Sequence, residues 1–318
     1  MSKADAKPIR TLLFVPGTEE ERLHRSVEHG ADAVMIDLEE PRTPFPEAAR
    51  DAARASVRAF LDSDRASGAG GAASPPRWFA RVQPPATGQT LKDLRAVVGP
   101  TLTGILVPKV YGPEDIHRAD ALLTCTEAEL GVEMGSTAIY PILETAQSLR
   151  LAYEIAVASQ RVQYMGGAVS RFGDIHQAVG YTWTAEGRET LFLRSKVLID
   201  ARAAGIRYPI SGMWGGDTDD IDGLRRWAGE LRGLGYFGMM LGAPAHVPVV
   251  NEIFSPTPAD VAFWQDLDRL ASAAEAEAVD SGPILYGSRN QGEGHEVHLA
   301  HVGSARQNLA WARDLGLL

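Results

Sequence analysis

Short apolar runs alternate with longer helical runs along most of this chain, and this alternation limits the possible fold more than any other feature. The runs that we interpret as strands lie at positions 10–15, 33–36, 78–82, 104–107, 137–143, 162–165, 208–210 and 237–241. About eight strands that alternate with helices are typical of a parallel α/β barrel. The sequence therefore predicts an α/β fold of the (β/α)8 TIM-barrel type. A doubly wound open sheet is the alternative that periodicity alone does not distinguish.

The alternation continues without a linker, so we expect one barrel domain followed by a short extension. The only low-complexity segment, ASGAGGAASPP at 66–76, is interpreted as a flexible loop because the same pattern continues on both sides of it. We place the barrel at residues 1–275 and a helical C-terminal extension at residues 276–318.

Charge and composition exclude several classes of function. Lysine plus arginine number 31 and aspartate plus glutamate 41, a formal net charge of −10, which disfavours a nucleic-acid partner. No apolar run approaches the roughly 18 residues that a membrane span needs. The first residues lack the apolar core of a signal peptide. No GxGxxG sequence follows a predicted strand and no GxxxxGK(S/T) sequence occurs, which disfavours Rossmann and P-loop nucleotide sites, and the single cysteine leaves no intrachain disulfide. We therefore expect a cytoplasmic protein with no membrane partner.

Charged residues gather where the predicted strands end, namely at Asp37, Glu39, Arg81, Lys109, Glu144 and Asp174. In a parallel barrel the C-terminal ends of the strands meet at one face, and that face carries the active site. Arg81 is placed to bind a substrate carboxylate with two donors, although an ordinary ion pair is the alternative. Asp37 could instead only orient a neighbour, and Lys109 could form a plain salt bridge.

Glu144 and Asp174 follow two predicted strands that are separated by one helical run. Because parallel strands joined by a helix end on the same side of a sheet, we expect the two carboxylates to lie close together. Mg²⁺ favours one or two carboxylates, several waters and an anionic substrate. We therefore predict that Glu144 and Asp174 bind a divalent cation. The alternatives are that Glu144 only stabilises a helix start and that Asp174 only caps the helix at 175–179.

Several motifs together resemble the citrate lyase beta-subunit / malyl-CoA lyase family over roughly residues 9–275. They are RTLLFVPGTEEER, GADAVMIDLEE, ARVQP, GILVPKV, PILETAQSL, RSKVLIDARAAGI and VVNEIFSPTPADV. The resemblance implies a (β/α)8 barrel that forms a homotrimer or hexamer and uses Mg²⁺, with Mn²⁺ as an alternative. It also implies a carbon–carbon lyase that cleaves a 3-hydroxy-acyl-CoA, such as malyl-, citramalyl- or citryl-CoA, into an acyl-CoA and a 2-oxo acid.

The resemblance implies roles for individual residues. Glu144 and Asp174 match the metal ligands, and Arg81 matches the arginine that holds the carboxylate of the oxo acid. Asp37 and Glu39 match an acidic strand-end motif that acts through metal-bound water and hydrogen bonds. We assign two further residues to substrate binding: Lys109, and the proline of the dipeptide that replaces the family's His-Pro pair, Pro244.

The tail departs from the family. Members often carry an aspartate there that reaches a neighbouring subunit's site as the general acid/base. Here the corresponding stretch is GEGHEVH at 292–298, so His298 would take that place. The extension at 276–318 is accordingly expected to act as a lid that contributes to a neighbouring subunit. Because of this departure, three alternatives to the lyase stay open: a thioesterase, an aldolase acting on a free hydroxy acid, and a non-catalytic binding subunit.

Overall fold

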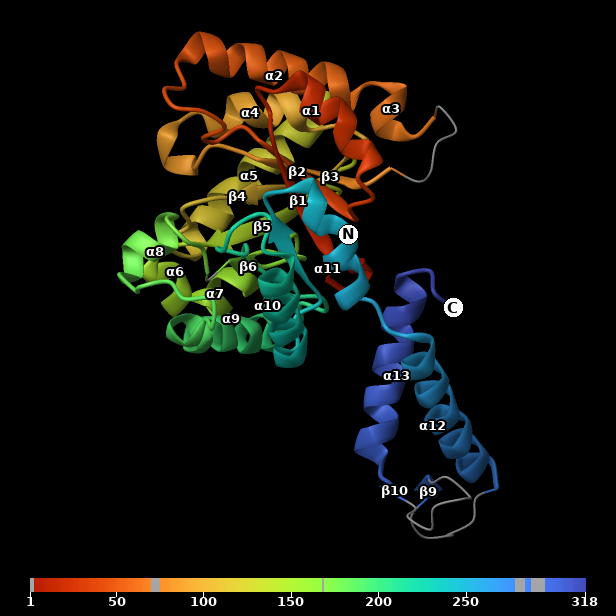
Figure 1. Cartoon of the computed structure of the whole chain (residues 1–318). Coiled ribbons are helices and arrows are strands. Elements are labelled where there is room, and N and C mark those ends of the chain that lie inside the picture. Colours follow the sequence, from red (N-terminus) through yellow and green to blue (C-terminus); the bar gives the residue numbers. More distant parts are fainter. Residues whose placement is uncertain (1–2, 70–74, 168, 278–283, 287–294) are drawn as a thin grey trace. The chain divides into compact units, whose positions relative to one another are not determined.

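The structure, a computed structural model, describes residues 3–69, 75–167, 169–277, 284–286 and 295–318. The chain divides into two compact units, Met1–Phe254 and Ser255–Leu318 (Figure 1). Residues 70–74 of the predicted flexible loop lie outside the described residues. Within the described part of the chain, no helix is long and apolar enough to cross a membrane.

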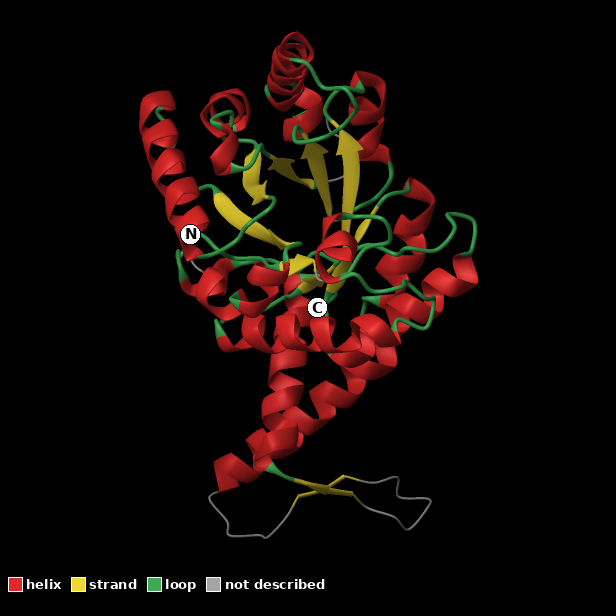
Figure 2. Ribbon diagram, turned by 90° about the vertical axis from the view of Figure 1, so that its left-hand side faces the viewer, coloured by secondary structure: helices red, strands yellow, loops and turns green. Residues whose placement is uncertain are grey.

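The first unit is a closed barrel of eight parallel strands in which each strand pairs with the next and the last pairs with the first. This closure confirms the predicted TIM barrel and excludes the open sheet. The strands are β1 Thr11–Pro16, β2 Ala33–Asp37, β3 Arg77–Arg81, β4 Leu102–Val107, β5 Ala138–Leu143, β6 Gly166–Gly167, β7 Ile210–Ser211 and β8 Gly238–Leu241. Figure 2 shows the strands surrounded by helices.

The helices of this unit follow the predicted alternation. They are α1 Glu20–Arg25, α2 Glu47–Leu61, α3 Asp64–Ser67, α4 Thr90–Val97, α5 Pro113–Leu130, α6 Ala146–Arg150, α7 Ala152–Val157, α8 Asp174–Val179, α9 Leu191–Ala203, α10 Ile221–Leu234 and α11 Val247–Ile253. Successive strand residues point to opposite faces. In β2, Val34 and Ile36 accordingly join the core under the helices, whereas Ala33 and Met35 join a second apolar cluster with residues of the other strands, which fills the barrel.

The prediction of a strand at 162–165 was wrong. Only Val162 makes an isolated bridge, to Ile139, and the sixth strand is Gly166–Gly167. The reason is steric, because a Cβ atom on Gly166 would lie 1.8 Å from the carbonyl oxygen of Ile210 on β7. The backbones of neighbouring strands approach so closely here that only glycine fits, and hydrophobic periodicity does not register glycine as a strand former.

The second unit contains a helical pair and a short hairpin ladder. Helices α12 Pro258–Glu277 and α13 Leu299–Asp314 pack through Leu267, Ala271, Val302 and Ala305. Strand β9 Ile284–Tyr286 pairs antiparallel with β10 His295–Val297. Because α12 packs on α13, it belongs to this unit, and the boundary falls after Phe254 rather than at the predicted residue 275. The expected lid function of the extension stays a prediction.

Candidate active site

Four of the predicted site residues lie at or just after the C-terminal ends of consecutive barrel strands. Asp37 ends β2, Arg81 ends β3, Lys109 follows β4, and Glu144 directly follows β5. The register of the sheet places Asp37 directly beside Arg81. Because all strands run parallel, these side chains meet at one end of the barrel, as the sequence predicted.

Arg81 is held between two buried carboxylates. Its Nε atom lies 2.6 Å from Oδ1 of Asp37, and its Nη1 atom lies 3.1 Å from Oε2 of Glu39. Burial lowers the pKa of Arg81, but the charges of Asp37 and Glu39 outweigh burial and hold that pKa above its ordinary value. The guanidinium therefore stays cationic, and both the predicted ion pair and the predicted place beside the pocket are present.

Lys109 links two parts of the site: the acidic loop after β2, which carries Glu39 and Glu40, and the end of β5. Its ammonium lies 2.8 Å from Oε1 of Glu39 and 3.0 Å from Oε1 of Glu40. Burial lowers the pKa of Lys109, yet these two carboxylates raise it above its ordinary value. The backbone N–H of Lys109 also donates to Oε1 of Glu144 at 2.7 Å. Lys109 thus forms the plain salt bridges that the sequence left open, and it also lines a cavity.

Glu144 is mostly buried, and its neighbours set its charge state. Burial raises its pKa to about 7, and the negative charges of Glu39 and Asp174 add to this, against the N–H of Lys109 and the charge of Arg81. The alternative that Glu144 only stabilises a helix start is not required to explain how the next helix begins. Thr145 occupies the cap of α6, in a reciprocal capping box with Ser148.

Asp174 is the first residue of α8 and is exposed. The cap position belongs to Gly173, which has no side chain, so the alternative that Asp174 only caps this helix is wrong. Its carboxylate is close enough to Glu144 to contribute to the raised pKa of that residue. The two predicted metal ligands therefore share one neighbourhood.

Two cavities adjoin these carboxylates, and both are lined by Glu144 and Asp174. The larger, of about 500 Å³, has otherwise mostly apolar walls that include Phe14, Met35, Ile142, Met213 and Met240, and its further charged residues are Arg81 and Arg171. The smaller, of about 430 Å³, is also lined by Lys109 and Tyr111. Sequence reasoning missed Arg171, because the loop that carries it matched no motif.

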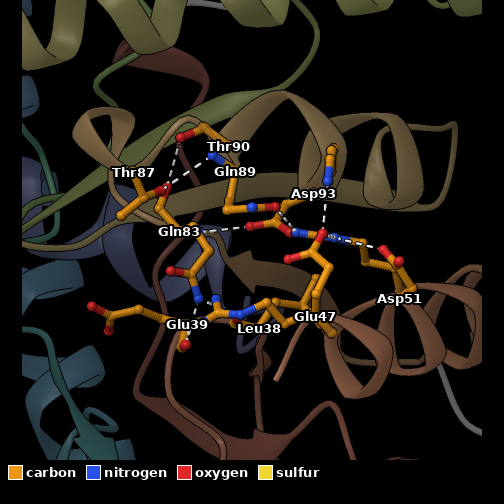
Figure 3. A network of polar contacts seen from close by, with 12 residues as sticks. Leu38, Glu39, Glu47, Asp51, Gln83, Thr87, Gln89, Thr90 and Asp93 are labelled. Atoms are coloured by element: carbon orange, nitrogen blue, oxygen red, sulfur yellow. Dashed lines mark hydrogen bonds and ion pairs between the residues drawn. The ribbon is translucent and has the colours of Figure 1, made fainter. Parts of the chain in front are cut away.

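A buried polar network supports the acidic loop from behind (Figure 3). The side-chain amide of Gln83 donates to the carbonyl oxygen of Leu38 at 2.9 Å and to that of Glu39. The backbone N–H of Gln83 donates to Asp93 at 2.7 Å, and Arg54 donates to the other oxygen of Asp93 at 2.7 Å. The ARVQP motif contains Gln83, but only the structure shows that it positions the loop.

Four predicted site residues do not line the described cavities: Asp37 and Glu39, which are buried against Arg81, and also Pro244 and His298. Pro244 begins a 3-10 turn, Pro244–His246, after β8, and the residue of that loop that lines the larger cavity is Gly242. His298 lies at the N-cap of α13 in the second unit, where its backbone N–H donates to Nδ1 of His301 at 3.0 Å. The substrate-binding role of Pro244 and the acid/base role of His298 stay predictions.

Comparison with known proteins shows which protein family the barrel resembles. The profile of the family described as HpcH/HpaI aldolase/citrate lyase matches residues 10–244. The citrate lyase subunit beta of Leuconostoc mesenteroides subsp. cremoris is 29% identical over 276 residues, 86% of this chain and 85% of that protein. The (3S)-malyl-CoA thioesterase of Cereibacter sphaeroides is 26% identical over 310 residues, 98% and 96% of the two chains. The L-malyl-CoA/beta-methylmalyl-CoA lyase of Rhodobacter capsulatus is 27% identical over 306 residues, 90% and 91% of them.

Solved structures show the same fold. A citrate lyase from Burkholderia xenovorans LB400 superposes with a TM-score of 0.76 at 15% identity, over 100% of this chain and 96% of that one. The citrate lyase beta subunit of M. tuberculosis, complexed with oxaloacetate and magnesium, superposes with a TM-score of 0.58 at 25% identity. That match covers 80% of this chain and 100% of the other.

Proposed function

Because the chain belongs to the HpcH/HpaI aldolase/citrate lyase family, we propose that it is a Mg²⁺-dependent carbon–carbon lyase. Its substrate is a 3-hydroxy-acyl-CoA such as malyl-, citramalyl- or citryl-CoA, and its products are an acyl-CoA and a 2-oxo acid. The observation that carries this proposal is that Glu144 and Asp174 line the same two cavities, one of which also contains Arg81. The relatives named citrate lyase subunit beta and malyl-CoA lyase support the reaction class.

Glu144 and Asp174 fit a divalent cation. Burial raises the pKa of Glu144 and the negative charge of Asp174 adds to this, so a cation held by both carboxylates would remove an unfavourable interaction. Among the described residues, no group of three or more potential metal ligands gathers. Two carboxylates completed by water and substrate are the set that Mg²⁺ favours, and the M. tuberculosis relative holds magnesium. When bound, Mg²⁺ would act as a Lewis acid on the oxygen atoms of the substrate.

Arg81 is proposed to hold the carboxylate of the 2-oxo acid. Its Nε and Nη1 atoms already pair with Asp37 and Glu39, which keeps the guanidinium from turning. Its remaining N–H donors are available to a carboxylate in the cavity. A guanidinium that is fixed before the substrate arrives orients the reacting bond and lowers the entropic part of the barrier.

Cleavage requires two proton transfers. The proton of the 3-hydroxyl group leaves as the C2–C3 bond breaks, and the electron pair of that bond passes to the enolate of the thioester. The enolate carbon then takes up a proton, which gives the acyl-CoA. We propose that Asp37 and Glu39 act near the hydroxyl group through water and hydrogen bonds. We propose that His298, acting in the site of a neighbouring subunit, protonates the carbon, because a histidine side chain can serve as an acid or base near neutral pH.

One relative favours a second candidate function. The (3S)-malyl-CoA thioesterase matches over 98% of this chain, including the second unit. A thioesterase would hydrolyse the thioester and release free CoA with the carbon chain intact. The altered tail is also compatible with an aldolase that acts on a free hydroxy acid and with a non-catalytic binding subunit.

Product analysis tests these candidates. The purified protein is incubated with malyl-, citramalyl- or citryl-CoA, or with the free hydroxy acids, in the presence of Mg²⁺, Mn²⁺ or EDTA. We expect acyl-CoA and a 2-oxo acid in equal amounts with Mg²⁺ and none with EDTA. Asp174→Asn should lower turnover on the order of 100-fold or more, while Asp219→Asn, at an exposed residue outside both cavities, should leave it unchanged.

Different products separate the candidate functions. Free CoA as the product identifies the thioesterase, and cleavage of the free acids identifies the aldolase. Turnover that survives both EDTA and Asp174→Asn would contradict the metal proposal. We further propose the homotrimer or hexamer and the cytoplasmic location expected from the sequence; light scattering on the purified protein measures the assembly.

A further inference from the structure

Arg171 is a second cation in the larger cavity, and the proposed mechanism does not use it. It lies in the loop between β6 and α8 and lines the same cavity as Arg81, Glu144 and Asp174. The loop continues directly into α8, whose first residue is Asp174. Arg171 is therefore placed beside the proposed reaction centre by the same short segment that carries one of the proposed metal ligands.

The guanidinium of Arg171 is held in place by neutral groups. It stacks over the ring of Phe172 at 4.8 Å and over that of Trp183 at 5.2 Å, and its Nη1 atom donates to the carbonyl oxygen of Gly215 at 3.3 Å. A Cβ atom on Gly215 would lie 2.6 Å from the indole nitrogen of Trp183 and 2.8 Å from Cβ of Arg171. The absence of a side chain at Gly215 is what lets these groups pack together.

The charge of Arg171 is not neutralised in the way that the charge of Arg81 is. Arg81 pairs with Asp37 and Glu39. The contacts of Arg171 in the described part of the chain are aromatic rings and one carbonyl oxygen. Stacking leaves the in-plane N–H donors of a guanidinium available to a carboxylate. Arg171 is thus oriented but has no anionic partner among the described residues.

The rest of the cavity wall indicates which ligand group would meet Arg171. Among the residues that line the larger cavity, the carboxylates are Glu144 and Asp174, and the cations are Arg81 and Arg171. Most of the remaining wall is apolar, so a second negative group of a ligand would find a charged partner there only at Arg171. Lys109, the cation of the smaller cavity, is already paired with Glu39 and Glu40.

We propose that Arg171 binds a second carboxylate of the 2-oxo acid, so that this site selects a dicarboxylic oxo acid. This inference rests on the proposed function and narrows its substrate class. Of the three candidate thioesters, citryl-CoA yields oxaloacetate, which has two carboxylates. Malyl-CoA yields glyoxylate and citramalyl-CoA yields pyruvate, which have one each. Arg81 and the metal would hold the carboxylate next to the oxo group, and Arg171 would hold the distal one.

Binding of oxo acids to the Mg²⁺-loaded protein tests this inference without turnover. Isothermal titration with fresh oxaloacetate and with pyruvate is carried out on the wild type, Arg171→Gln and Arg171→Lys. A charge-assisted bidentate contact predicts that the wild type binds oxaloacetate on the order of tenfold or more tightly than pyruvate. Arg171→Gln should lower the affinity for oxaloacetate to that for pyruvate and leave pyruvate binding unchanged, and Arg171→Lys should restore part of the preference.

One control variant and three contrary outcomes complete this test. Arg25→Gln, at an exposed arginine of α1, should change neither affinity. Equal binding of both oxo acids by the wild type would overturn this inference alone, and that measurement needs no variant. A variant that weakens binding of CoA but not of oxaloacetate would also overturn it, because Arg171 would then contact the carrier. If neither oxaloacetate nor pyruvate binds in the presence of Mg²⁺, the proposed function is overturned as well.

Discussion

The backbone N–H of Lys109 donates a 2.7 Å hydrogen bond to Oε1 of Glu144, and so ties the end of β4 to the residue after β5. Lys109 adopts this position with φ of 51°, in the left-handed region that few residues other than glycine occupy. The orientation of a proposed metal ligand therefore depends on a strained backbone at a neighbouring strand end.

Substitutions at Lys109 separate the backbone from the side chain. Lys109→Gly and Lys109→Val both remove the ion pairs with Glu39 and Glu40, but only valine opposes the positive φ. We expect the free energy of unfolding of the valine variant to be lower than that of the glycine variant by about 1–3 kcal/mol. Urea denaturation measures the difference. Equal stabilities would show that the φ angle of Lys109 is not a constraint.

The support of the acidic loop by Gln83 predicts a loss of stability and of activity together. Gln83→Ala leaves the buried carbonyl oxygens of Leu38 and Glu39 without their donor. This should cost about 1–3 kcal/mol of unfolding free energy. It should also reduce turnover through displacement of Glu39.

Thr87→Val is the matched control for Gln83→Ala. Thr87 lies at the outer end of the network in Figure 3 and is exposed. We expect Thr87→Val to change the free energy of unfolding and the turnover only slightly. Chemical denaturation and steady-state kinetics on the two variants test this. A Gln83→Ala protein with unchanged kinetics would show that the loop keeps its position without the amide.

Substitution of Gly166 tests how closely the backbones of β5, β6 and β7 approach one another. In Gly166→Ala the new methyl group would meet the carbonyl oxygen of Ile210 at 1.8 Å and the hydroxyl of Tyr140 at 2.5 Å. Because the first contact is with backbone, we expect a loss of more than about 3 kcal/mol, or failure to fold. Thermal unfolding with circular dichroism detects either result.

At a second glycine of the same barrel, Gly229, we expect alanine to stabilise the fold rather than to destabilise it. Gly229 lies in α10, and apart from the adjoining backbone of its own helix and its two chain neighbours, no atom lies within 4 Å of the position of an added Cβ. The substitution should raise the free energy of unfolding by roughly 0.5–1 kcal/mol, because alanine restricts the unfolded chain and favours the helix. A lower melting temperature for Gly229→Ala would argue against this assignment of the helix.

The buried pair of Glu127 and Arg161 predicts a pH-dependent contribution to stability. Arg161 donates to both carboxylate oxygens of Glu127 at 2.8 and 2.7 Å. Burial raises the pKa of Glu127, but the hydrogen bonds from Arg161 and from the backbone of Gly135 and Thr137 outweigh burial and hold the pKa below its ordinary value. A depressed pKa stabilises the fold above the pKa of the unfolded chain, and this contribution is lost as the pH falls through the folded pKa.

Glu127→Gln removes that contribution. At pH 7 the variant should lose about 1.5–3 kcal/mol, because Arg161 loses its charge-assisted contact with Glu127 but keeps its ion pair with Asp120 at 2.6 Å. As the pH falls below about 4.5, the wild type loses the same contribution, so the difference between the two proteins should shrink. Urea titrations at a series of pH values measure it. A difference that is constant with pH would contradict the assigned role of the Glu127 charge.

Local patterns were sufficient for the fold because a barrel is built from elements that each carry their own signal. Alternating apolar residues in β2 divide between the barrel interior and the helix layer, as the two-residue period requires. The exception is β6, where Gly166 and Gly167 replace apolar residues. There the contact between neighbouring backbones determines the residue type, and no local period reports such a contact.

The sequence by itself determined the order of strands and helices, the family, and the set of charged residues at the strand ends that includes Arg81, Glu144 and Asp174. Chain order places Arg81 and Glu144 at strand termini and Asp174 at the start of the helix after β6, and parallel strands bring these ends together. The tertiary structure alone decided how the charges are paired. It buried Asp37 and Glu39 against Arg81 and raised the pKa of Glu144. It also placed Arg171 in the same cavity. Pairing depends on distances between segments far apart in the chain, and such distances exist only after folding.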